Sequence, residues 1–203
     1  MQDTIRIMSA AEKYQVVSEA EYLASEDVSV ERHEWVGGVI YSMAGETTDH
    51  NQIAQNLQSV IRGHLRGSAC RVFINGVKLR LDVAETFYYP DIMVACDPRD
   101  TDRRFIRYPR VIIEVLSEHT QQTDRREKLF AYLQVETLEE YVLVSSLRRE
   151  IVIYRRADGW HPQPLLDAAH ELQLASLDLR VSVSEIYEGA VLGPASGSPT
   201  QPG

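Results

Sequence analysis

The sequence predicts one α/β domain in which a mixed β-sheet carries helices on its faces. Apolar residues recur at helical spacing between residues 53 and 65 and again between 122 and 134. Short alternating or continuous apolar runs, which are typical of strands, occupy residues 72–81, 87–95, 111–116 and 141–144. Because helical and strand patterns alternate along 203 residues, one core covered by helices is the expected architecture.

The first expected elements are a short helix and a hairpin. Ser18 followed by Glu21 forms a capping-box pattern, which predicts a helix through about Ser25. Gly37-Gly38 separates two β-rich arms within residues 30–43, as in a tight hairpin. Residues 1–17 are interpreted as an extension that precedes a single domain at residues 18–190.

The middle of the chain continues this alternation. Residues 47–49 offer capping side chains for a helix through about Leu65. The β-like residues 72–81 turn or bulge at Asn75-Gly76, and residues 87–95 form a further strand. The polar connection that follows leads to the next apolar run.

Residues 111–116 indicate a strand that is buried on both faces. A second long helix is expected at about residues 122–134, capped by Thr123 or Asp124. The remaining predicted elements are strands within 141–144 and 150–155 and a short closing helix at 183–187. Residues 191–203 are rich in Gly, Pro and Ser, so we expect a disordered tail.

The composition is that of an ordinary soluble globular protein, with 44% hydrophobic and 25% charged residues. No stretch approaches the length of a membrane-spanning helix, and the N-terminus lacks the apolar run of a secretory signal. We therefore expect a cytoplasmic protein. In that reducing compartment, Cys70 and Cys96 are predicted to be small buried residues rather than a disulfide framework.

Two carboxylates stand among apolar strand residues. Glu114 precedes Val115-Leu116, and burying a carboxylate is costly unless it is paired, protonated or metal-bound. Asp91 begins another apolar run after Pro90. If the two strands are neighbours, the carboxylates meet at one end of the sheet, where a divalent cation removes their repulsion. The alternatives are a turn aspartate, and a glutamate just past its strand that bonds an arginine.

A third candidate is the charged segment 124–128. On a helix, Asp124 and Lys128 lie on one face. If Lys128 points at the carboxylates, its ammonium can orient a water molecule and stabilise charge on a phosphate. An ordinary exposed ion pair between Asp124 and Lys128 is the alternative.

Together these residues resemble a known family. The matching segments are residues 88–94 (YYPDIMV), 112–117 (IIEVLS), 124–129 (DRREKL) with Tyr132, and 140–144 (EYVLV). They are similar to the Uma-two family of endonucleases in the restriction-endonuclease-like, PD-(D/E)XK superfamily. Further similarity lies in the hairpin with Gly38 and in His50 at the start of the long helix.

The resemblance implies a restriction-endonuclease-like fold, with a central four-stranded mixed sheet flanked by helices and an added N-terminal hairpin. It also implies that Asp91 and Glu114 are catalytic and bind Mg²⁺ or Mn²⁺, together with the Val115 carbonyl. The superfamily lysine of E-x-K would stand two residues after Glu114, but this position is Leu116. Lys128 is the candidate replacement.

Three further residues are secondary candidates, of which Glu34 and His50 carry over by position. Lys78 is a weaker substitute for the missing lysine. Glu34 would complete the acidic cluster, and His50 would assist nearby. An N-terminal helix residue without a catalytic role is the alternative for His50.

The predicted function is metal-dependent hydrolysis of nucleic-acid phosphodiester bonds, with DNA as the expected partner. The net charge of −9 argues against a basic footprint, although arginines gather between the two acids, at positions 99, 103, 104, 107 and 110. An inactive nuclease-like binding or assembly module is the second hypothesis, and hydrolysis of a small phosphoester is the third. The exposed edge of the hairpin at residues 35–41 also predicts a homodimer.

Overall fold

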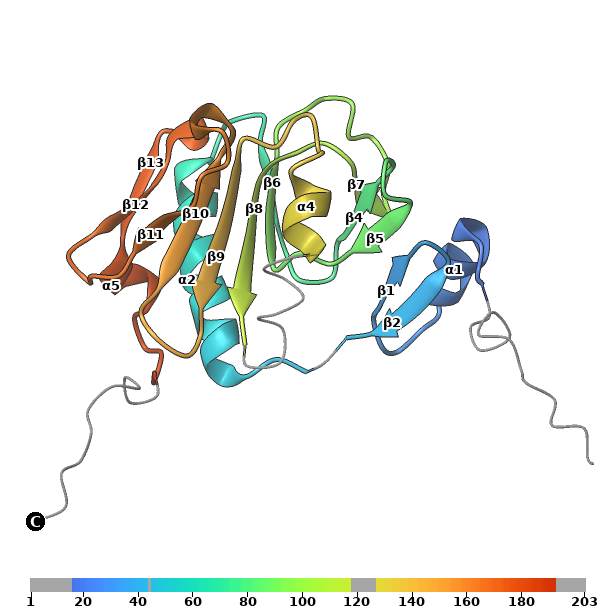
Figure 1. Cartoon of the computed structure of the whole chain (residues 1–203), viewed down its shortest axis with the longest axis horizontal. Helices are drawn as coiled ribbons and strands as arrows, with labels where there is room; N and C mark the ends of the chain where they lie inside the picture. The colour runs from blue at the N-terminus through green and yellow to red at the C-terminus, as the bar shows by residue number, and fades with distance from the viewer. Residues whose placement is uncertain (1–15, 44, 118–126, 193–203) are drawn as a thin grey trace, which may run out of the picture.

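The computed structural model describes residues 16–43, 45–117 and 127–192, and its centre is a six-stranded mixed sheet (Figure 1). Its order is β11-β10-β9-β8-β6-β3, formed by Gln163–Leu165, Ile151–Arg155, Glu140–Ser145, Pro109–Leu116, Ile92–Ala95 and Arg71–Ile74. β8 and β9 pair in parallel and the other neighbours are antiparallel. The mixed α/β prediction is confirmed, with a sheet larger than the four strands implied.

A five-stranded sheet lies beside it, in the order β2-β1-β5-β4-β7. Its strands are Val39–Ser42, His33–Val36, Thr86–Tyr88, Lys78–Leu81 and Phe105–Ile106. β3 pairs with β6 in the first sheet, while the following β4 pairs with β5 in the second. One two-stranded ribbon therefore passes from sheet to sheet.

The prediction of one continuous strand at residues 87–95 is wrong, because the structure has two strands there, β5 and β6. They are separated at Tyr89-Pro90-Asp91, opposite the turn at Asn75-Gly76. Proline offers no N–H to a strand ladder, which favours a break at this point. The break makes Asp91 the residue that immediately precedes β6.

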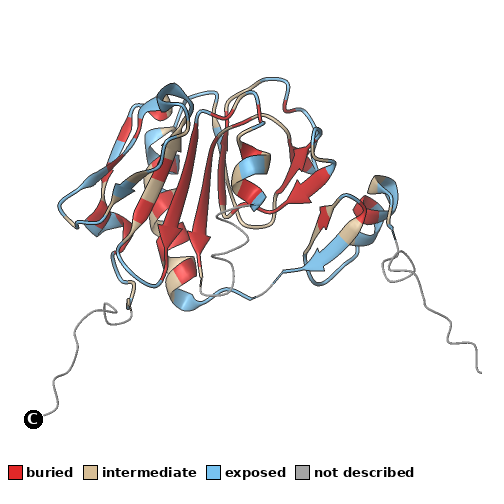
Figure 2. Ribbon diagram, viewed as in Figure 1, coloured by how far each residue is buried: buried red, intermediate tan, exposed pale blue. Residues whose placement is uncertain are grey.

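Apolar residues alternate between the two faces of the six-stranded sheet. Val111, Ile113 and Val115 pack against α2 (Thr48–His64). The same core includes residues of β12 (Glu171–Leu174), β13 (Leu179–Ser182) and α5 (Val183–Ile186). Ile112 and Leu116 face the opposite core, which contains Tyr132 of α4 (Leu129–Tyr132). Figure 2 shows the central strands buried between these layers.

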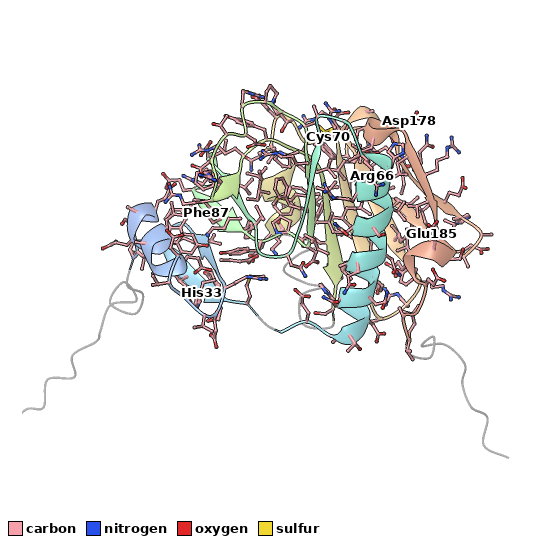
Figure 3. All side chains as sticks on the ribbon, turned by 180° about the vertical axis from the view of Figure 1, so that it is seen from behind. His33, Arg66, Cys70, Phe87, Asp178 and Glu185 are labelled. Carbon is pink, nitrogen blue, oxygen red and sulfur yellow. A yellow bond between two sulfur atoms is a disulfide. The ribbon has the colours of Figure 1, made fainter. Side chains whose placement is uncertain are left out.

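The N-terminal elements match their prediction. α1 (Glu19–Glu26) has the predicted Ser18 capping box, and Val36 pairs with Val39 in the β1–β2 hairpin. An aromatic cluster packs α1 against the five-stranded sheet, and its members are Tyr22, Trp35, Phe87 and Phe105. Phe87 is labelled in Figure 3. β2 is the outer strand of its sheet. The homodimer stays a prediction.

Some of the remaining helices and strands were predicted from the sequence, and others were not. α2, β8, β9, β10 and α5 occur where they were expected. The predicted start of the helix at 122–134 lies outside the described residues, as do residues 1–15 and 193–203. β7, β11, β12 and β13 have two to four residues each, which is too short to produce a clear period. In the described ranges, no helix has the length and hydrophobicity needed to cross a bilayer.

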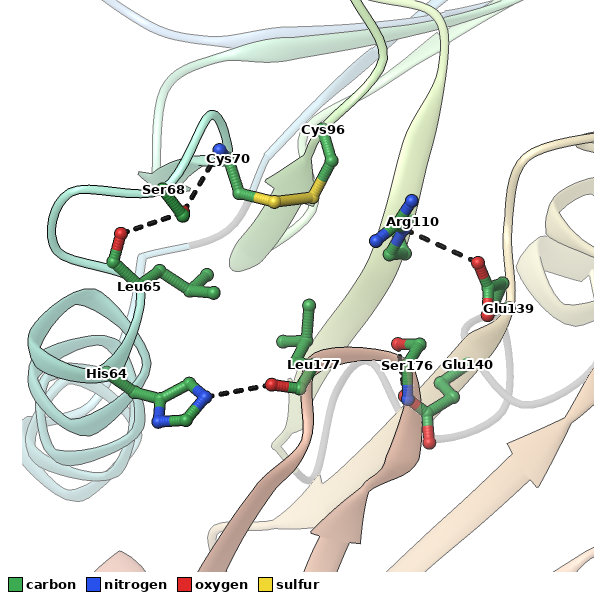
Figure 4. The surroundings of a disulfide bond; sticks show 10 residues. All are labelled: His64, Leu65, Ser68, Cys70, Cys96, Arg110, Glu139, Glu140, Ser176 and Leu177. Atoms are coloured by element: carbon green, nitrogen blue, oxygen red, sulfur yellow. Dashed lines mark hydrogen bonds and ion pairs between the residues drawn. A yellow bond between two sulfur atoms is a disulfide. The ribbon is translucent and has the colours of Figure 1, made fainter.

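The prediction for the two cysteines is wrong. Cys70 and Cys96 form a disulfide, with Cα atoms 4.1 Å apart, and both side chains are half-buried (Figure 4). The last β3–β6 pair is Arg71 with Ala95, so the cysteines stand opposite each other one residue further on. The inference from compartment alone ignored this strand register.

Candidate active site

Asp91 and Glu114 come together because β6 and β8 are neighbours. The register pairs Ile92 with Ile113, so the acids occupy the next position toward the end of β8. The Asp91 N–H donates to Glu114 Oε2 over 3.3 Å, and the Val115 N–H donates to Asp91 Oδ2 over 2.6 Å. Glu114 is 3% exposed, and the Asp91 side chain retains 14%. The two carboxylates therefore meet at one end of the sheet.

Lys128 lies between two of the predicted acids. Its Nζ is 2.9 Å from Glu34 Oε1 and 3.6 Å from Glu114 Oε1, and its side chain is only 9% exposed. Glu34 belongs to β1 of the five-stranded sheet, whereas Glu114 belongs to the six-stranded sheet. The lysine is thus a buried cation between the two sheets.

Tyr132 adds a hydrogen-bond donor to Glu114. Its hydroxyl donates to Glu114 Oε1 over 2.8 Å. Burial and the neighbouring Glu114 raise the pKa of Tyr132 well above its usual value, so the hydroxyl keeps its proton. Tyr132 was not predicted as a site residue, although its position four residues after Lys128 places both on one helical face.

His50 approaches Asp91 from the first turn of α2, where Thr47 accepts the His50 N–H over 3.2 Å. His50 Nε2 lies 3.1 Å from Asp91 Oδ2, and Nδ1 lies 3.5 Å from Glu46 Oε2. Burial lowers the pKa of His50. Asp91, Glu46 and the Val115 backbone outweigh this effect, so the net pKa is raised above its ordinary value.

Glu46 and Asn75 belong to this surrounding and were not predicted. Asn75 Nδ2 donates to Glu46 Oε2 over 3.1 Å, and its N–H donates to the Asp91 carbonyl over 3.0 Å. The spacing of four between Glu46 and His50 is a signal that could have identified the pair. Asn75 is brought to them by the β3–β6 pairing, which local sequence patterns do not reveal.

The donor set fits a divalent cation. Carboxylates gather at this end of the sheet from four residues: Glu34, Glu46, Asp91 and Glu114. Within the described residues, the basic side chains that contact them are the Lys128 ammonium and the His50 imidazole. Carboxylate oxygens are preferred ligands of Mg²⁺ and Mn²⁺. His50 Nδ1 is in addition buried without a hydrogen bond.

One secondary candidate, Lys78, does not join this cluster. Lys78 Nζ lies 5.6 Å from the centre of the Tyr89 ring, and burial lowers the pKa of Lys78. The carboxylates that oppose this shift are Glu26 and Asp27, at the end of α1. Lys78 is thus placed against the N-terminal unit. Asp124 lies outside the described residues.

The arginines between the two acids are largely neutralised by carboxylates. The pairs are Arg99 with Asp97 and Glu136, Arg104 with Asp102, Arg107 with Asp82, and Arg110 with Glu139. Arg110 also lines a cleft of about 620 Å³ at the opposite end of β8 from Glu114. These residues therefore do not form a basic surface beside the acidic pair.

The fold and the site define the class of protein. The fold matches a solved structure from Anabaena variabilis, described as "a putative nuclease belonging to DUF820", with a TM-score of 0.69 and 18% identity. The match covers 83% of this chain and 96% of that one. The chain is thus an α/β protein of the restriction-endonuclease-like fold, with an acidic cluster at one end of its central sheet.

The family follows from the sequence match. Residues 19–184 match the Uma2 family, described as "Putative restriction endonuclease", and the chain belongs to this family. Two relatives come from Synechocystis, "Uncharacterized protein slr1290" and "Uncharacterized protein sll1609". The first is 35% identical over 85% of this chain and 92% of the relative. The second is 28% identical over 70% of this chain and 81% of the relative.

Proposed function

We propose that this protein is a Mg²⁺- or Mn²⁺-dependent endonuclease that hydrolyses phosphodiester bonds of nucleic acid, most simply DNA. The observation that carries the proposal is the adjacency of Asp91 and Glu114 at the end of β6 and β8, with Lys128 3.6 Å from Glu114. Membership of a restriction-endonuclease family supports the same substrate class.

Each residue has a defined part in this proposal. Asp91, Glu114 and the Val115 carbonyl would hold the cation. When bound, it would make water a stronger nucleophile and stabilise negative charge on the phosphate. Lys128 would hold its ammonium against the scissile phosphate. It would thus supply the positive charge that the superfamily lysine provides, because Leu116 stands at the position of that lysine.

Two further residues would position the machinery. Tyr132 donates to Glu114 Oε1, and this bond fixes the carboxylate toward Lys128. Glu34 holds the Lys128 ammonium at 2.9 Å in the absence of substrate. A phosphate would then share the ammonium with Glu34.

A second candidate function is binding without catalysis. The neutralised arginines and the net charge of −9 favour it, because a nuclease usually offers phosphates a basic surface. In this alternative, the acidic cluster would be a structural remnant within a binding or assembly module.

The test compares cleavage of plasmid DNA, single-stranded DNA, RNA and a generic phosphodiester in Mg²⁺, Mn²⁺ and EDTA. Asp91→Ala and Glu114→Ala should abolish metal-dependent cleavage while circular dichroism shows a retained fold. Glu139→Ala, an exposed acid at the opposite end of the sheet, is the matched control and should cleave normally. Full activity in both site variants, or none in the wild type, would refute the proposal. Cleavage of the generic phosphodiester alone would indicate a small-molecule hydrolase.

A further inference from the structure

Asp91 contacts a second group of possible metal ligands on its side toward α2, away from Glu114 and Lys128. Glu46, His50 and Asp91 each offer one ligand atom, and these atoms lie within 4.8 Å of one another. Glu114 instead faces α4, where Tyr132 and Lys128 contact it. Asp91 stands at the sheet end between the two groups, so its carboxylate has access to both.

The imidazole of His50 gives this cluster a feature that acids alone lack. His50 is 6% exposed, and its Nδ1 is buried without a hydrogen bond while facing Glu46. A buried polar atom without a partner is costly, and a metal ion is one of the partners that can satisfy it.

The surrounding residues hold the ligands in place. Thr47 fixes the first turn of α2 by accepting the His50 N–H, and Asn75 Nδ2 holds Glu46 Oε2 at 3.1 Å. Hydrogen bonds to a ligating carboxylate, such as the one from Asn75 to Glu46, orient metal ligands in known sites. Glu46, with a side chain that is 31% exposed, leaves the cluster open to solvent for an entering cation.

We propose that Glu46, His50 and Asp91 form a second metal position, which shares Asp91 with the Asp91–Glu114 position and selects Mn²⁺ over Mg²⁺. The proposal deepens the proposed nuclease function and rests on it for the first position. An imidazole suits transition-metal ions, whereas Mg²⁺ prefers oxygen ligands and gives up water reluctantly. The centre would then be a two-metal site in which one position is oxygen-only and the other includes nitrogen.

The test is calorimetric titration of the full chain with Mn²⁺ alone and with Mg²⁺ alone. The wild type should bind two Mn²⁺ per chain. His50→Gln keeps a side chain able to hydrogen-bond Asp91 but is a poor ligand, and Glu46→Gln changes a more exposed residue. Both should weaken one of the two Mn²⁺ sites roughly 10–100-fold or more, a range already reached when an outer-shell partner is lost. Mg²⁺ binding should change much less.

Glu114→Gln separates this inference from the proposed function. It should remove the other Mn²⁺ site and leave the His50-dependent one, and thermal unfolding should show that each variant is folded. One Mn²⁺ per chain, lost in Glu114→Gln and unaffected by His50→Gln and Glu46→Gln, would overturn the second position and leave the proposed function intact. No Mn²⁺ binding by the wild type would overturn both.

Discussion

Two buried glutamates on adjacent strands lie toward opposite ends of the central sheet. Glu114 in β8 is 3% exposed, and Glu140 in β9 is 2% exposed. In the parallel register, Glu140 lies opposite Val111, three residues before Glu114. Burial is therefore nearly equal for the two carboxylates, although they lie toward opposite ends of the paired strands. The chemical difference between them lies in their partners.

Glu140 accepts hydrogen bonds from several donors, of which Ser176 is drawn beside it in Figure 4. It accepts the N–H groups of Ala175 and Ser176 over 2.9 and 3.1 Å, the Ser176 hydroxyl over 2.5 Å and Arg155 Nε over 3.3 Å. These contacts attach the 3₁₀ turn Ala175–Leu177 to the sheet. A carboxylate satisfied in this way is structural.

Glu114 instead shares its surroundings with other acids. Asp91 is its strand neighbour, and Glu34 is bound to the same lysine. Excess negative charge at one end of a sheet is an arrangement that a cation stabilises. Burial alone therefore does not distinguish the two carboxylates, whereas the presence of a second acid beside Glu114 does.

The largest expected effect is a contrast between two variants: Glu114→Gln should lose activity, and Glu140→Gln should lose stability. Glu114→Gln should lower metal-dependent cleavage by roughly 100–1000-fold or more, the range for loss of one key electrostatic group. Glu140→Gln should cleave normally per folded molecule but lose about 1–3 kcal/mol of stability, because backbone donors lose a charged acceptor. Cleavage rates and urea unfolding measure the two effects. Equal cleavage rates in both variants would contradict different roles for Glu114 and Glu140.

Removal of the Lys128 charge should come next. Lys128→Met leaves Glu34 and Glu114 buried without their shared ammonium, which should cost about 3–5 kcal/mol of unfolding free energy in EDTA. The double variant with Glu34→Gln should recover part of this loss, because one of the two uncompensated charges is gone. An unchanged urea midpoint in the single variant would mean that the lysine does not compensate these acids.

A smaller effect is expected from the disulfide, which lies at the Glu140 end. Cys70 and Cys96 are separated by 26 positions, and closing a loop of that length stabilises the fold by about 3 kcal/mol. The Cys70→Ser, Cys96→Ser double variant should unfold at lower urea concentration yet cleave DNA at the normal rate. Loss of cleavage in the folded variant would show that the two ends are coupled.

The smallest effect should follow from Tyr132→Phe. This change removes one donor to Glu114 and should cost about 1 kcal/mol of stability. Cleavage should fall less than tenfold, because a positioning residue is lost and no ligand is removed. A loss as severe as that of Glu114→Gln would assign Tyr132 a direct part in the reaction.

The strand patterns predicted much of this arrangement. The apolar runs after Asp91 and before Glu114 indicated two neighbouring strands, and the antiparallel register brings the acids to one end. The position of Lys128 followed from the family motif. All three depend on local patterns that a strand or helix preserves.

The remaining features depend on long-range pairing. The ribbon that passes between the sheets determines where Lys78 and Asn75 lie, and no local period encodes that passage. The same pairing joins Cys70 to Cys96. Residues that are neighbours along the chain diverge where strands leave one sheet for another. For a related reason, the arginines between Asp91 and Glu114 in sequence do not lie beside these acids in space.

The position of Glu34 in the N-terminal hairpin has a consequence for when the acidic cluster forms during folding. The acidic cluster draws residues from both sheets and from the first turn of α2, so it is complete only when both sheets and this helix have formed. A nascent or partly folded molecule would lack a working centre. For the proposed nuclease, such late assembly would protect the cell's own DNA, because only the complete fold would be able to cleave it.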